Sequence, residues 1–457
     1  MFQVQEIVEK QKEFFQRQET RDIAFRIQYL NQLKNTIKEM EEEICQALHL
    51  DLRKPRQESY LTEIGMVYGA IDLMIKKTKK WSKAKRKHTP LYLWGKSYVE
   101  YEPYGTVLII APFNYPFLLA IEPLVGALAA GNTVVVKPSE LAQHTEKVIT
   151  KLIEKTFPRD LVASVEGEVE TTTQLLEQKF DYIFFTGSPQ VGKVVMKAAA
   201  ENLIPISLEL GGKSPTLVDM SADIKVAARR IIWGKLLNNG QTCIAPDYIL
   251  VDSSVKKQLI EEMKESIEAF YGPSSKQSED YGRIVNNKHF LRLSTILEKD
   301  KEFIIYGGQV DEKEKYIAPT LIEGSNTSLA AMEEEIFGPI LPIIEFSDLE
   351  EAIQIIKTYE NPLALYIFSY RKENISKLKK AVLSGNISIN DTLKHTSNPF
   401  LPFGGVGNSG IGSYHGKYSF ETFSHKRGVY ENTLKFNVDA IFPPYSEGKM
   451  SLLKKFF

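Results

Sequence analysis

Apolar side chains recur at helical spacing through the first eighty residues, as Leu30, Leu33 and Ile37 illustrate. Residues three or four positions apart lie on one face of a helix, so this part of the chain is predicted to be helical. Residues 98–104 lose that spacing and predict an extended strand.

From residue 105 onward, short apolar runs alternate with amphipathic stretches. We predict strands at residues 106–111, 133–137, 161–166 and 181–185, and helices at residues 116–130, 142–157, 171–178 and 191–202. Repeated strand–helix units form a doubly wound parallel sheet, which binds ligands at the carboxyl ends of its strands. A second alternation between residues 214 and 390 predicts a second α/β unit, and a late strand is expected at residues 427–431.

Length and composition limit the possible classes of protein. A chain of 457 residues exceeds one ordinary hydrophobic core and predicts two or three domains. The formal net charge of −1 gives no reason to expect nucleic acid as a partner. The only two cysteines, Cys45 and Cys243, cannot build a disulfide framework and favour a reducing, cytoplasmic location. The seven histidines lack metal-binding spacing, so no metal site is predicted.

No stretch of the sequence predicts a signal peptide or a membrane span. The first ten residues carry mixed charge without an apolar core. Residues 117–130 contain Glu122 and Pro123 and fall short of the roughly 18 apolar residues of a span, so we expect a buried helix there. Residues 76–88 hold eight Lys or Arg, which predicts a solvated helix end, with contact to an anionic surface as the alternative.

Cys243 is the first candidate for chemistry. It follows a polar loop, Asn238-Asn239-Gly240-Gln241-Thr242, at the end of a predicted helix, where a thiol could face a cleft. Thiolates are good nucleophiles, and a nearby charge or dipole raises the thiolate fraction. The alternative is an inert, half-buried thiol, which is the reading we give Cys45 in its amphipathic helical segment.

Two polar residues could support a reactive thiol. Asn114 ends the first predicted parallel strand, where its side-chain amide could stabilise an oxyanion; the alternative is a cap on the following helix. Glu209 lies between two leucines and before a glycine pair, so poor solvation should raise its pKa towards that of a useful base. The alternative for Glu209 is a buried carboxylate paired with Lys213.

Further segments have the composition of a phosphate-bearing ligand site. Gly187 and Gly192 lie in a strand–turn–helix segment where backbone N–H groups could meet phosphate, although it lacks the GxGxxG pattern. Lys137 and Glu140 close the second predicted strand, where they could bind hydroxyls or phosphate; ordinary surface charge is the alternative. Residues 333–335 are three glutamates before an Ile-Phe-Gly-Pro turn, with an acidic helix N-terminus as the alternative.

Taken together, these segments resemble the aldehyde dehydrogenase superfamily. Residues 208–213 (LELGGK) match its general-base motif, and residues 240–243 (GQTC) match its nucleophile motif. Asn114, Lys137, residues 185–188 with Gly192, residues 335–339 (EIFGP) and residues 402–410 (PFGGVGNSG) match further family segments. The matches follow the family's order from about residue 100 to about residue 430, so the resemblance spans most of the chain.

The resemblance implies a covalent mechanism. Cys243 attacks the aldehyde, and Asn114 and the Cys243 N–H hold the oxyanion of the thiohemiacetal. Hydride transfer to a nicotinamide then leaves a thioester, which a water activated by Glu209 hydrolyses to the acid.

The resemblance also implies the residues that bind the cofactor. They are Lys137 and Glu140 at the adenosine ribose, Gly187, Ser188 and Gly192 beside the adenine and pyrophosphate, and Glu335 and Phe337 at the nicotinamide ribose. NAD is expected because Glu140 should repel a 2′-phosphate, although class 3 relatives often accept NADP.

Residues 243–248 (CIAPDY) and 412–416 (GSYHG) are similar to the class 3 branch. That branch is typically dimeric and oxidises medium- to long-chain aliphatic or aromatic aldehydes. Phe113 departs from it, since many relatives carry tryptophan there, and we expect altered substrate fit with the chemistry retained. Tyr115, Trp233, Leu237 and residues 395–398 are expected to line the substrate tunnel.

The resemblance implies three parts of the chain. A Rossmann-like NAD-binding domain is expected at residues 1–208, with residues 84–104 contributing to a small β oligomerisation element. An α/β catalytic domain is expected at residues 209–415, and an oligomerisation strand with a C-terminal tail at residues 416–457. Residues 452–457 (LLKKFF) are basic and apolar but too short to span a bilayer. We expect this tail to pack on a partner subunit, with weak peripheral membrane contact as the alternative.

Three other functions fit parts of the sequence. A CoA-acylating aldehyde dehydrogenase would resolve the thioester with CoA, but that branch generally does not use a base at the position of Glu209. A cysteine hydrolase or acyltransferase would need a histidine partner for Cys243, and none is evident. A catalytically silent relative would not be expected to keep Cys243, Asn114 and Glu209 together.

Overall fold

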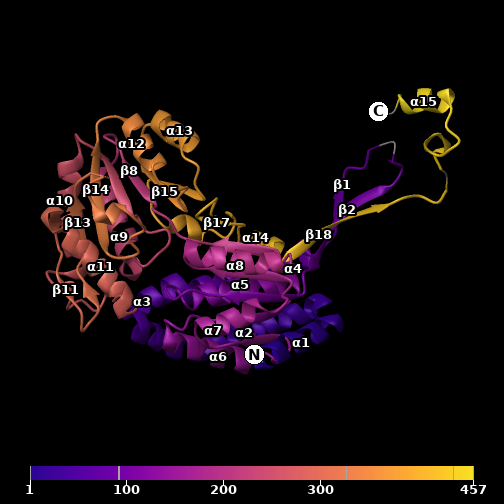
Figure 1. Ribbon diagram of the computed structural model, residues 1–457, viewed down its shortest axis with the longest axis horizontal. Helices are drawn as coiled ribbons and strands as arrows, with labels where there is room; N and C mark the ends of the chain where they lie inside the picture. The colour runs from indigo at the N-terminus through magenta and orange to yellow at the C-terminus, as the bar shows by residue number, and fades with distance from the viewer. Residues whose placement is uncertain (1, 91–92, 326, 436, 456–457) are drawn as a thin grey trace.

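The computed structural model describes residues 2–90, 93–325, 327–435 and 437–455. Two α/β units and a layer of N-terminal helices form the body of the protein, and a narrow arm extends from it (Figure 1). The chain begins in the helical layer and ends at the tip of the arm.

The N-terminal layer consists of α1 (Phe2–Gln16), α2 (Ile23–Leu52), α3 (Arg56–Ser59) and α4 (Gly65–Trp81). Asp22 begins α2 by accepting a hydrogen bond from the backbone N–H of Ala24 at 2.9 Å, as a helix N-cap does. In the expected apolar stripe of α2, Leu30, Leu33 and Ile37 have no exposed surface, whereas Phe25 and Ile27 are partly buried. Helix α2 therefore packs on α4, α5 (Leu118–Ala130) and α6 (Gln143–Thr156), while α1 contacts strands of the first sheet.

The first unit is a six-stranded sheet in the order β17-β7-β6-β3-β4-β5. Its strands are β3 (Thr106–Ile110), β4 (Thr133–Lys137), β5 (Val162–Ser164), β6 (Tyr182–Thr186), β7 (Ile206–Glu209) and β17 (Gly410–Ile411). The intervening helices are α5 (Leu118–Ala130), α6 (Gln143–Thr156), α7 (Val169–Leu176) and α8 (Pro189–Glu201). Every residue of β3, β4 and β6 is buried, which is why these strands read as continuous apolar runs.

The second unit is a seven-stranded sheet in the order β10-β13-β14-β9-β8-β15-β16. Its strands are β8 (Pro215–Val218), β9 (Tyr248–Asp252), β10 (Ile304–Tyr306), β13 (Thr320–Glu323), β14 (Ile340–Phe346), β15 (Ala364–Phe368) and β16 (Asn386–Ile389). Its helices are α9 (Ile224–Leu236), α10 (Lys256–Tyr271), α11 (Asn287–Lys299), α12 (Leu349–Lys357) and α13 (Lys372–Ala381). A short hairpin of β11 (Val310–Asp311) and β12 (Tyr316–Ile317) lies between β10 and β13 in the sequence.

The arm is an antiparallel sheet of β1 (Lys85–Lys87), β2 (Lys96–Pro103) and β18 (Ser424–Glu431). It brings the two segments of the expected oligomerisation element side by side, with Lys96 opposite Glu431 and Pro103 opposite Ser424. Helix α14 (Lys417–Thr422) leads into β18, and α15 (Glu447–Leu453) lies near the end of the chain (Figure 1). Phe456 and Phe457 of the predicted tail lie outside the described residues.

The predicted α/β class is confirmed, with three differences in detail. Strand β17 pairs antiparallel with β7, and β10 pairs antiparallel with β13, so neither sheet is purely parallel. Strand β17 belongs to the first sheet, although its residues fall within the range 209–415 that was predicted as the catalytic domain. The basic stretch at residues 76–88 is only partly a helix end, because α4 stops at Trp81 and Lys85–Lys87 form β1. The domain boundaries themselves remain a prediction.

The apolar segment at residues 117–130 is a buried helix, as predicted. All residues of α5 are buried, including Glu122 and Pro123. Among the described residues, no helix is both long and apolar enough to cross a membrane.

Candidate active site

The loop before Cys243 has an unusual backbone. Three successive residues adopt left-handed conformations, with φ of 52° at Asn238, 58° at Asn239 and 75° at Gly240. Asparagine and glycine tolerate this region better than other residues, which explains the Asn-Asn-Gly sequence. A Cβ at Gly240 would lie 2.3 Å from the carbonyl oxygen of Gly338, so the nucleophile loop packs directly against the loop at residues 335–339.

Side chains on both sides fix this loop. The Gln241 side chain donates to the carbonyl of Arg283 at 3.0 Å and accepts from the N–H of Val285 at 3.0 Å. The hydroxyls of Thr242 and Tyr115 are 2.7 Å apart, within hydrogen-bond distance. These contacts hold the residues immediately before Cys243 in one arrangement.

Asn114 lies against the same loop. Its Nδ2 donates to the carbonyl of Gln241 at 3.0 Å, and its own carbonyl accepts from the Asn238 side chain at 2.7 Å. The alternative role as a helix cap is wrong, because the N-cap of α5 is Phe117 and the side chain of Asn114 donates instead to the loop before Cys243. An amide nitrogen has two hydrogens, so Asn114 Nδ2 could donate a second hydrogen bond to an oxyanion near Cys243.

The thiol of Cys243 is partly buried and protonated near neutral pH. Its pKa is raised to about 12, chiefly by burial and also by the negative charge of the carboxyls of Glu335 and Glu209. The backbone N–H groups of Cys243 and Ile244 act in the opposite direction, since they bond the thiolate. Activation of this thiol therefore requires a nearby proton acceptor.

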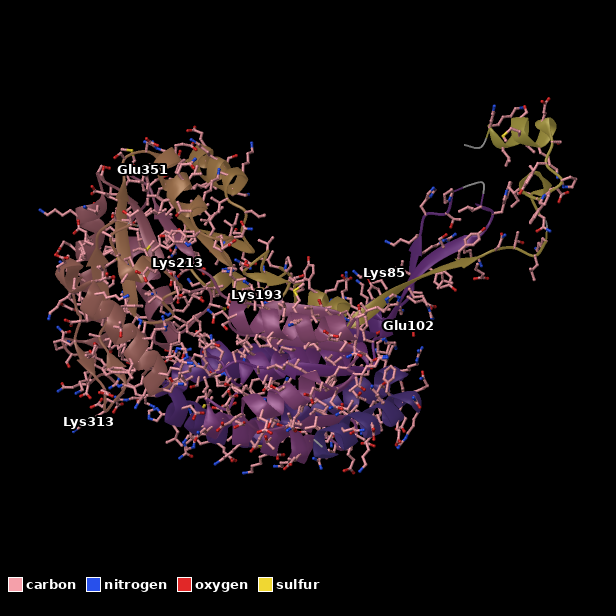
Figure 2. All side chains as sticks on the ribbon, viewed as in Figure 1. Lys85, Glu102, Lys193, Lys213, Lys313 and Glu351 are labelled. Atoms are coloured by element: carbon pink, nitrogen blue, oxygen red, sulfur yellow. The ribbon has the colours of Figure 1, made fainter. Side chains whose placement is uncertain are left out.

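Glu209 ends β7 and is buried, with only 3% of its surface exposed. Neither carboxyl oxygen has a hydrogen-bond partner within the part of the chain that the structure describes. Burial raises its pKa well above the ordinary value. The alternative pairing with Lys213 is wrong: Lys213 lies within the second unit (Figure 2), where its Nζ contacts Asp247 Oδ2 at 2.6 Å. Glu209 is thus a buried acid whose side chain has no hydrogen-bond partner among the described residues.

Glu335 is the second carboxyl beside the thiol. A Cβ on Gly211 would lie 2.3 Å from its Oε2, so only glycine leaves room for this carboxyl. Burial raises the pKa of Glu335 to about 8, and the charge of Asp247 adds to the rise. The alternative of an acidic helix N-terminus is wrong, because no helix begins at these residues and the chain continues into strand β14.

Phe337 has a left-handed backbone, with φ of 51°. Its ring meets that of Phe113 edge-on, with centroids 5.8 Å apart, and Phe113 also contacts His289 at 5.0 Å. The phenylalanine that replaces the tryptophan of many relatives therefore joins an aromatic cluster next to the loop at residues 335–339.

The strand ends of the first sheet carry the remaining predicted residues. Lys137 is 1% exposed, and its Nζ donates to Glu140 Oε2 at 3.0 Å and to the Pro138 carbonyl at 2.6 Å. The Gly187 N–H donates to the Glu209 carbonyl at 3.0 Å, so the turn after β6 contacts the end of β7. Both pairs lie at the carboxyl edge of the sheet, where ligands of doubly wound sheets bind.

The turn after β6 opens helix α8. Ser188 is its N-cap and accepts from the N–H of Val191 at 3.3 Å. A Cβ at Gly192 would lie 2.8 Å from a methyl group of Leu210, so glycine allows α8 to pack closely on β7. The first turn of α8 thus offers a positive helix end, which suits a phosphate.

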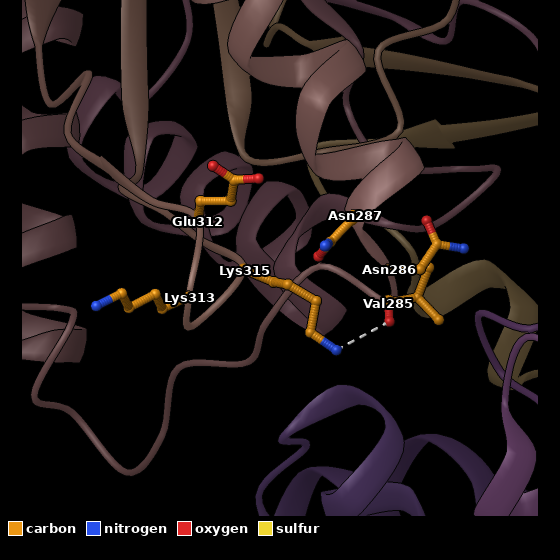
Figure 3. A pocket seen from close by; sticks show the side chains of 6 residues that line it. All are labelled: Val285, Asn286, Asn287, Glu312, Lys313 and Lys315. Carbon is orange, nitrogen blue, oxygen red and sulfur yellow. Dashed lines mark hydrogen bonds between the residues drawn. The ribbon is translucent and has the colours of Figure 1, made fainter.

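The structure also has a surface hollow of about 490 Å³ (Figure 3). Its described lining residues are Val285, Asn286, Asn287, Glu312, Lys313 and Lys315. Lys315 Nζ donates to the Val285 carbonyl at 3.2 Å across the hollow (Figure 3). Since these lining residues include none of the predicted site residues, we assign the hollow no part in the reaction.

Comparison with known proteins identifies the family. Residues 2–429 match the family model described as "Aldehyde dehydrogenase family". The chain is 50% identical over 447 residues to a 4,4′-diaponeurosporen-aldehyde dehydrogenase of Staphylococcus aureus, covering 98% of this chain and 97% of that protein. It is 46% identical over 428 residues to a dimeric, NADP-preferring aldehyde dehydrogenase of Canis lupus familiaris, covering 93% and 94%.

A solved structure agrees with this. The structure of the substrate-bound state of Staphylococcus aureus AldH superposes with a TM-score of 0.97 at 49% identity, and the match covers 99% of each chain. The chain therefore belongs to the aldehyde dehydrogenase family, as its resemblance predicted, and is an enzyme that oxidises aldehydes to acids.

The sequence analysis missed several buried groups around the site. Lys54 and Glu63 are charged yet almost fully buried, at 1% and 0% exposed. The partly buried Glu58 accepts a hydrogen bond from the backbone of the nucleophile loop. All three lie between α2 and α4, nearly two hundred residues before Cys243, and no local pattern marks them as neighbours of the site.

Proposed function

We propose that this enzyme oxidises medium- or long-chain aliphatic or aromatic aldehydes through a covalent intermediate on Cys243. The observation that supports this proposal is the proximity of three groups. Asn114 Nδ2 donates to the Gln241 carbonyl, in the loop before Cys243, at 3.0 Å, and Glu209 is close enough to Cys243 to interact with it electrostatically. One donor, one thiol and one base are what aldehyde oxidation through a thioester requires.

The first step is attack of the Cys243 sulfur on the aldehyde carbon. The thiol is protonated near neutral pH, so its proton must pass to a neighbouring base. The new oxyanion is held by Asn114 Nδ2 and the N–H of Cys243, which lowers the barrier to the thiohemiacetal.

The cofactor we propose is NAD, and NADP is an alternative. When bound, the cofactor would accept the hydride that the thiohemiacetal loses as it becomes a thioester. Lys137 and Glu140 would hold the adenosine ribose, Gly187, Ser188 and Gly192 would lie beside the adenine and pyrophosphate, and Glu335 and Phe337 would position the nicotinamide ribose. The buried Lys137, the N-terminus of α8 and the close packing at Gly192 fit such a ligand. Glu140 favours NAD because its charge repels a 2′-phosphate.

The last step is hydrolysis of the thioester. Glu209 takes a proton from water, and its raised pKa makes it a stronger base than an exposed carboxylate. The same residue argues against CoA as the acceptor, because a water-activating base is then superfluous. Analysis of the product as free acid or acyl-CoA, with CoA present, separates these two reactions.

The range of substrates depends on the walls around Cys243. Tyr366 donates to the Ile244 carbonyl at 2.6 Å, and its ring lies 6.0 Å from that of His395. His395 belongs to the expected tunnel, together with Tyr115, Trp233 and Leu237. These largely apolar walls support large hydrophobic aldehydes as substrates.

We further propose a cytoplasmic homodimer built around the arm. The arm and tail expose large apolar side chains, including Leu434, Tyr445 and Met450. Exposed apolar surface of this kind is typical of an interface. Sedimentation of the full-length protein and of a variant lacking residues 432–457 would test the proposed dimer.

Co-sedimentation of the same two proteins with anionic liposomes tests the alternative, weak membrane contact by the tail. Equal co-sedimentation of the two proteins would contradict that alternative.

The central test is replacement of the nucleophile. Cys243→Ala should abolish aldehyde-dependent reduction of NAD, because no other group in the proposed site can form the thioester. Cys45→Ala is the matched control, since Cys45 is buried in α2 and takes no part in the proposed chemistry. Aldehydes of graded chain length, each assayed with NAD and NADP, would define substrate and cofactor. Normal turnover by Cys243→Ala would exclude the proposed mechanism.

A further inference from the structure

An irregular segment, residues 52–63, connects the N-terminal helices to the active site. Arg53 has a left-handed backbone with φ of 50°, and α3 has only four residues before a π-helical turn at Tyr60–Ile64. The segment carries the charged side chains of Lys54, Glu58 and Glu63 inward. Burying charge is costly unless each group has a partner, so their contacts identify what the segment does.

Lys54 and Glu63 hold the loop that carries Asn114. Lys54 Nζ is 2.5 Å from Glu63 Oε1 and donates to the Asn114 carbonyl at 3.4 Å. Glu63 Oε2 accepts from the N–H groups of Phe117 and Leu118 at 2.9 and 3.1 Å, at the start of α5. This ion pair therefore fixes the oxyanion side of the site.

Glu58 holds the loop that leads to Cys243. Its Oε1 accepts from the backbone N–H of Asn238 at 2.8 Å. Asn238 is the first of the three left-handed residues, and its side chain bonds the carbonyls of Asn114 and Gln241 at 2.7 and 3.1 Å. A left-handed non-glycine residue persists only where surrounding contacts hold it, and Glu58 supplies one of these contacts.

We propose that Glu58 is a positioning residue for hydride transfer, which acts through Asn238 to keep Cys243 in register with Asn114. Glu58 touches neither the aldehyde nor Cys243 in this role. It anchors the nucleophile loop to the same segment that anchors the oxyanion loop. This role rests on the proposed function, because it assumes that Cys243 and Asn114 act on one substrate.

The role predicts a particular response to pH. Burial raises the pKa of Glu58 to about 7, while Lys54 and the Asn238 N–H act to lower it. The charged and titratable groups that interact with Glu58 are Lys54, Glu63, Asp280, Tyr115 and Tyr271. Glu58 is therefore ionised above about pH 7 and neutral below it. The ionised carboxylate accepts a stronger hydrogen bond, so the loop is held more tightly at the higher pH.

Single-turnover hydride transfer, measured with excess aldehyde and NAD on both sides of neutral pH, tests this proposal. Glu58→Ala removes the acceptor and should slow the step about tenfold with little change in KM, since substrate contacts are intact. Glu58→Gln keeps a neutral acceptor, so it should match the wild type below neutral pH and recover only about twofold of the loss above it. It should also lose the roughly fivefold rise near neutral pH that ionisation gives the wild type.

Glu42→Gln is the matched control, because Glu42 is an exposed glutamate on the preceding helix. It should follow the wild-type profile. Equal rates for Glu58→Ala and the wild type, or a Glu58→Gln profile that keeps the rise, would overturn the proposal. If Glu58→Ala does not fold, the pH profile of hydride transfer by Glu58→Gln alone tests the proposal. A wild type that transfers no hydride would instead refute the proposed function, so the two failures are distinct.

Discussion

Replacement of Glu209 by Gln separates its role as a base from every other contribution of that residue. Glutamine has nearly the same shape, and the carboxyl accepts no hydrogen bond among the described residues, so little packing or bonding is lost. General-base catalysis contributes about 10²–10⁴-fold, or about 3–5 kcal/mol. We expect the steady-state rate of Glu209→Gln to fall by that factor, because the acyl-enzyme is no longer hydrolysed.

Stopped-flow measurement of NAD reduction would show which step is affected. Hydride transfer precedes hydrolysis, so Glu209→Gln should give a burst of about one NADH per active site and then stall. Glu201→Gln, an exposed change at the end of α8, is the control and should turn over normally. An unchanged steady-state rate in Glu209→Gln, or a slow rate without any burst, would refute deacylation by Glu209.

The same variant has a second signature in stability. The folded-state pKa of Glu209 lies well above the ordinary value of 4.5, so the folded protein binds more protons than the unfolded chain above that pH. Glu209 therefore costs stability as pH rises from 4.5 towards its folded pKa, by up to about 1.4 kcal/mol per pH unit. Glu209→Gln should lack this loss and unfold at a higher temperature than the wild type in alkaline buffer. If the melting temperatures of the wild type and of Glu209→Gln changed in parallel with pH, this would contradict the burial of an ionisable group at residue 209.

Two further substitutions test the geometry of the site. Asn114→Ala removes one oxyanion donor and should slow single-turnover hydride transfer about 10²–10³-fold, whereas a loss below about threefold would contradict the assignment. Gly240→Ala forces a side chain into a left-handed position with its Cβ 2.3 Å from the Gly338 carbonyl oxygen. It should lower the free energy of unfolding by about 2–4 kcal/mol in denaturant melts. Gly69→Ala, in open space on α4, is the control and should be neutral or slightly stabilising.

Elements with strong patterns could be predicted from the sequence. The strand at residues 133–137 was predicted with its observed bounds, because a strand buried on both faces is a continuous apolar run. Cys243 and Asn114 could be singled out because each follows the end of a predicted helix or strand. Glu209 could be singled out only as an acid between two leucines before a glycine pair, since β7, the strand that it ends, was not predicted. Long parallel connections then bring such ends together at one edge of the fold.

Other features depend on contacts between distant parts of the chain. No local pattern distinguishes Lys54, Glu58 and Glu63 from ordinary surface charges, and only tertiary packing turns them inward. The pairing of Lys213 with Asp247 in place of Glu209 likewise depends on how β8 and β9 align. Strand β17 has two residues, too few for any periodicity to predict it.

Strand β17 also bears on the order in which this protein can be completed during synthesis. Gly410 pairs with Glu209 itself, and the Leu210 N–H donates to the Ser409 carbonyl at 3.1 Å. A nascent chain that has produced only the first unit therefore holds the proposed base on an open sheet edge. About two hundred more residues must leave the ribosome before that edge is covered, which takes on the order of 10–40 s. Until then, the strand that carries Glu209 is a point where an unfinished chain can pair wrongly.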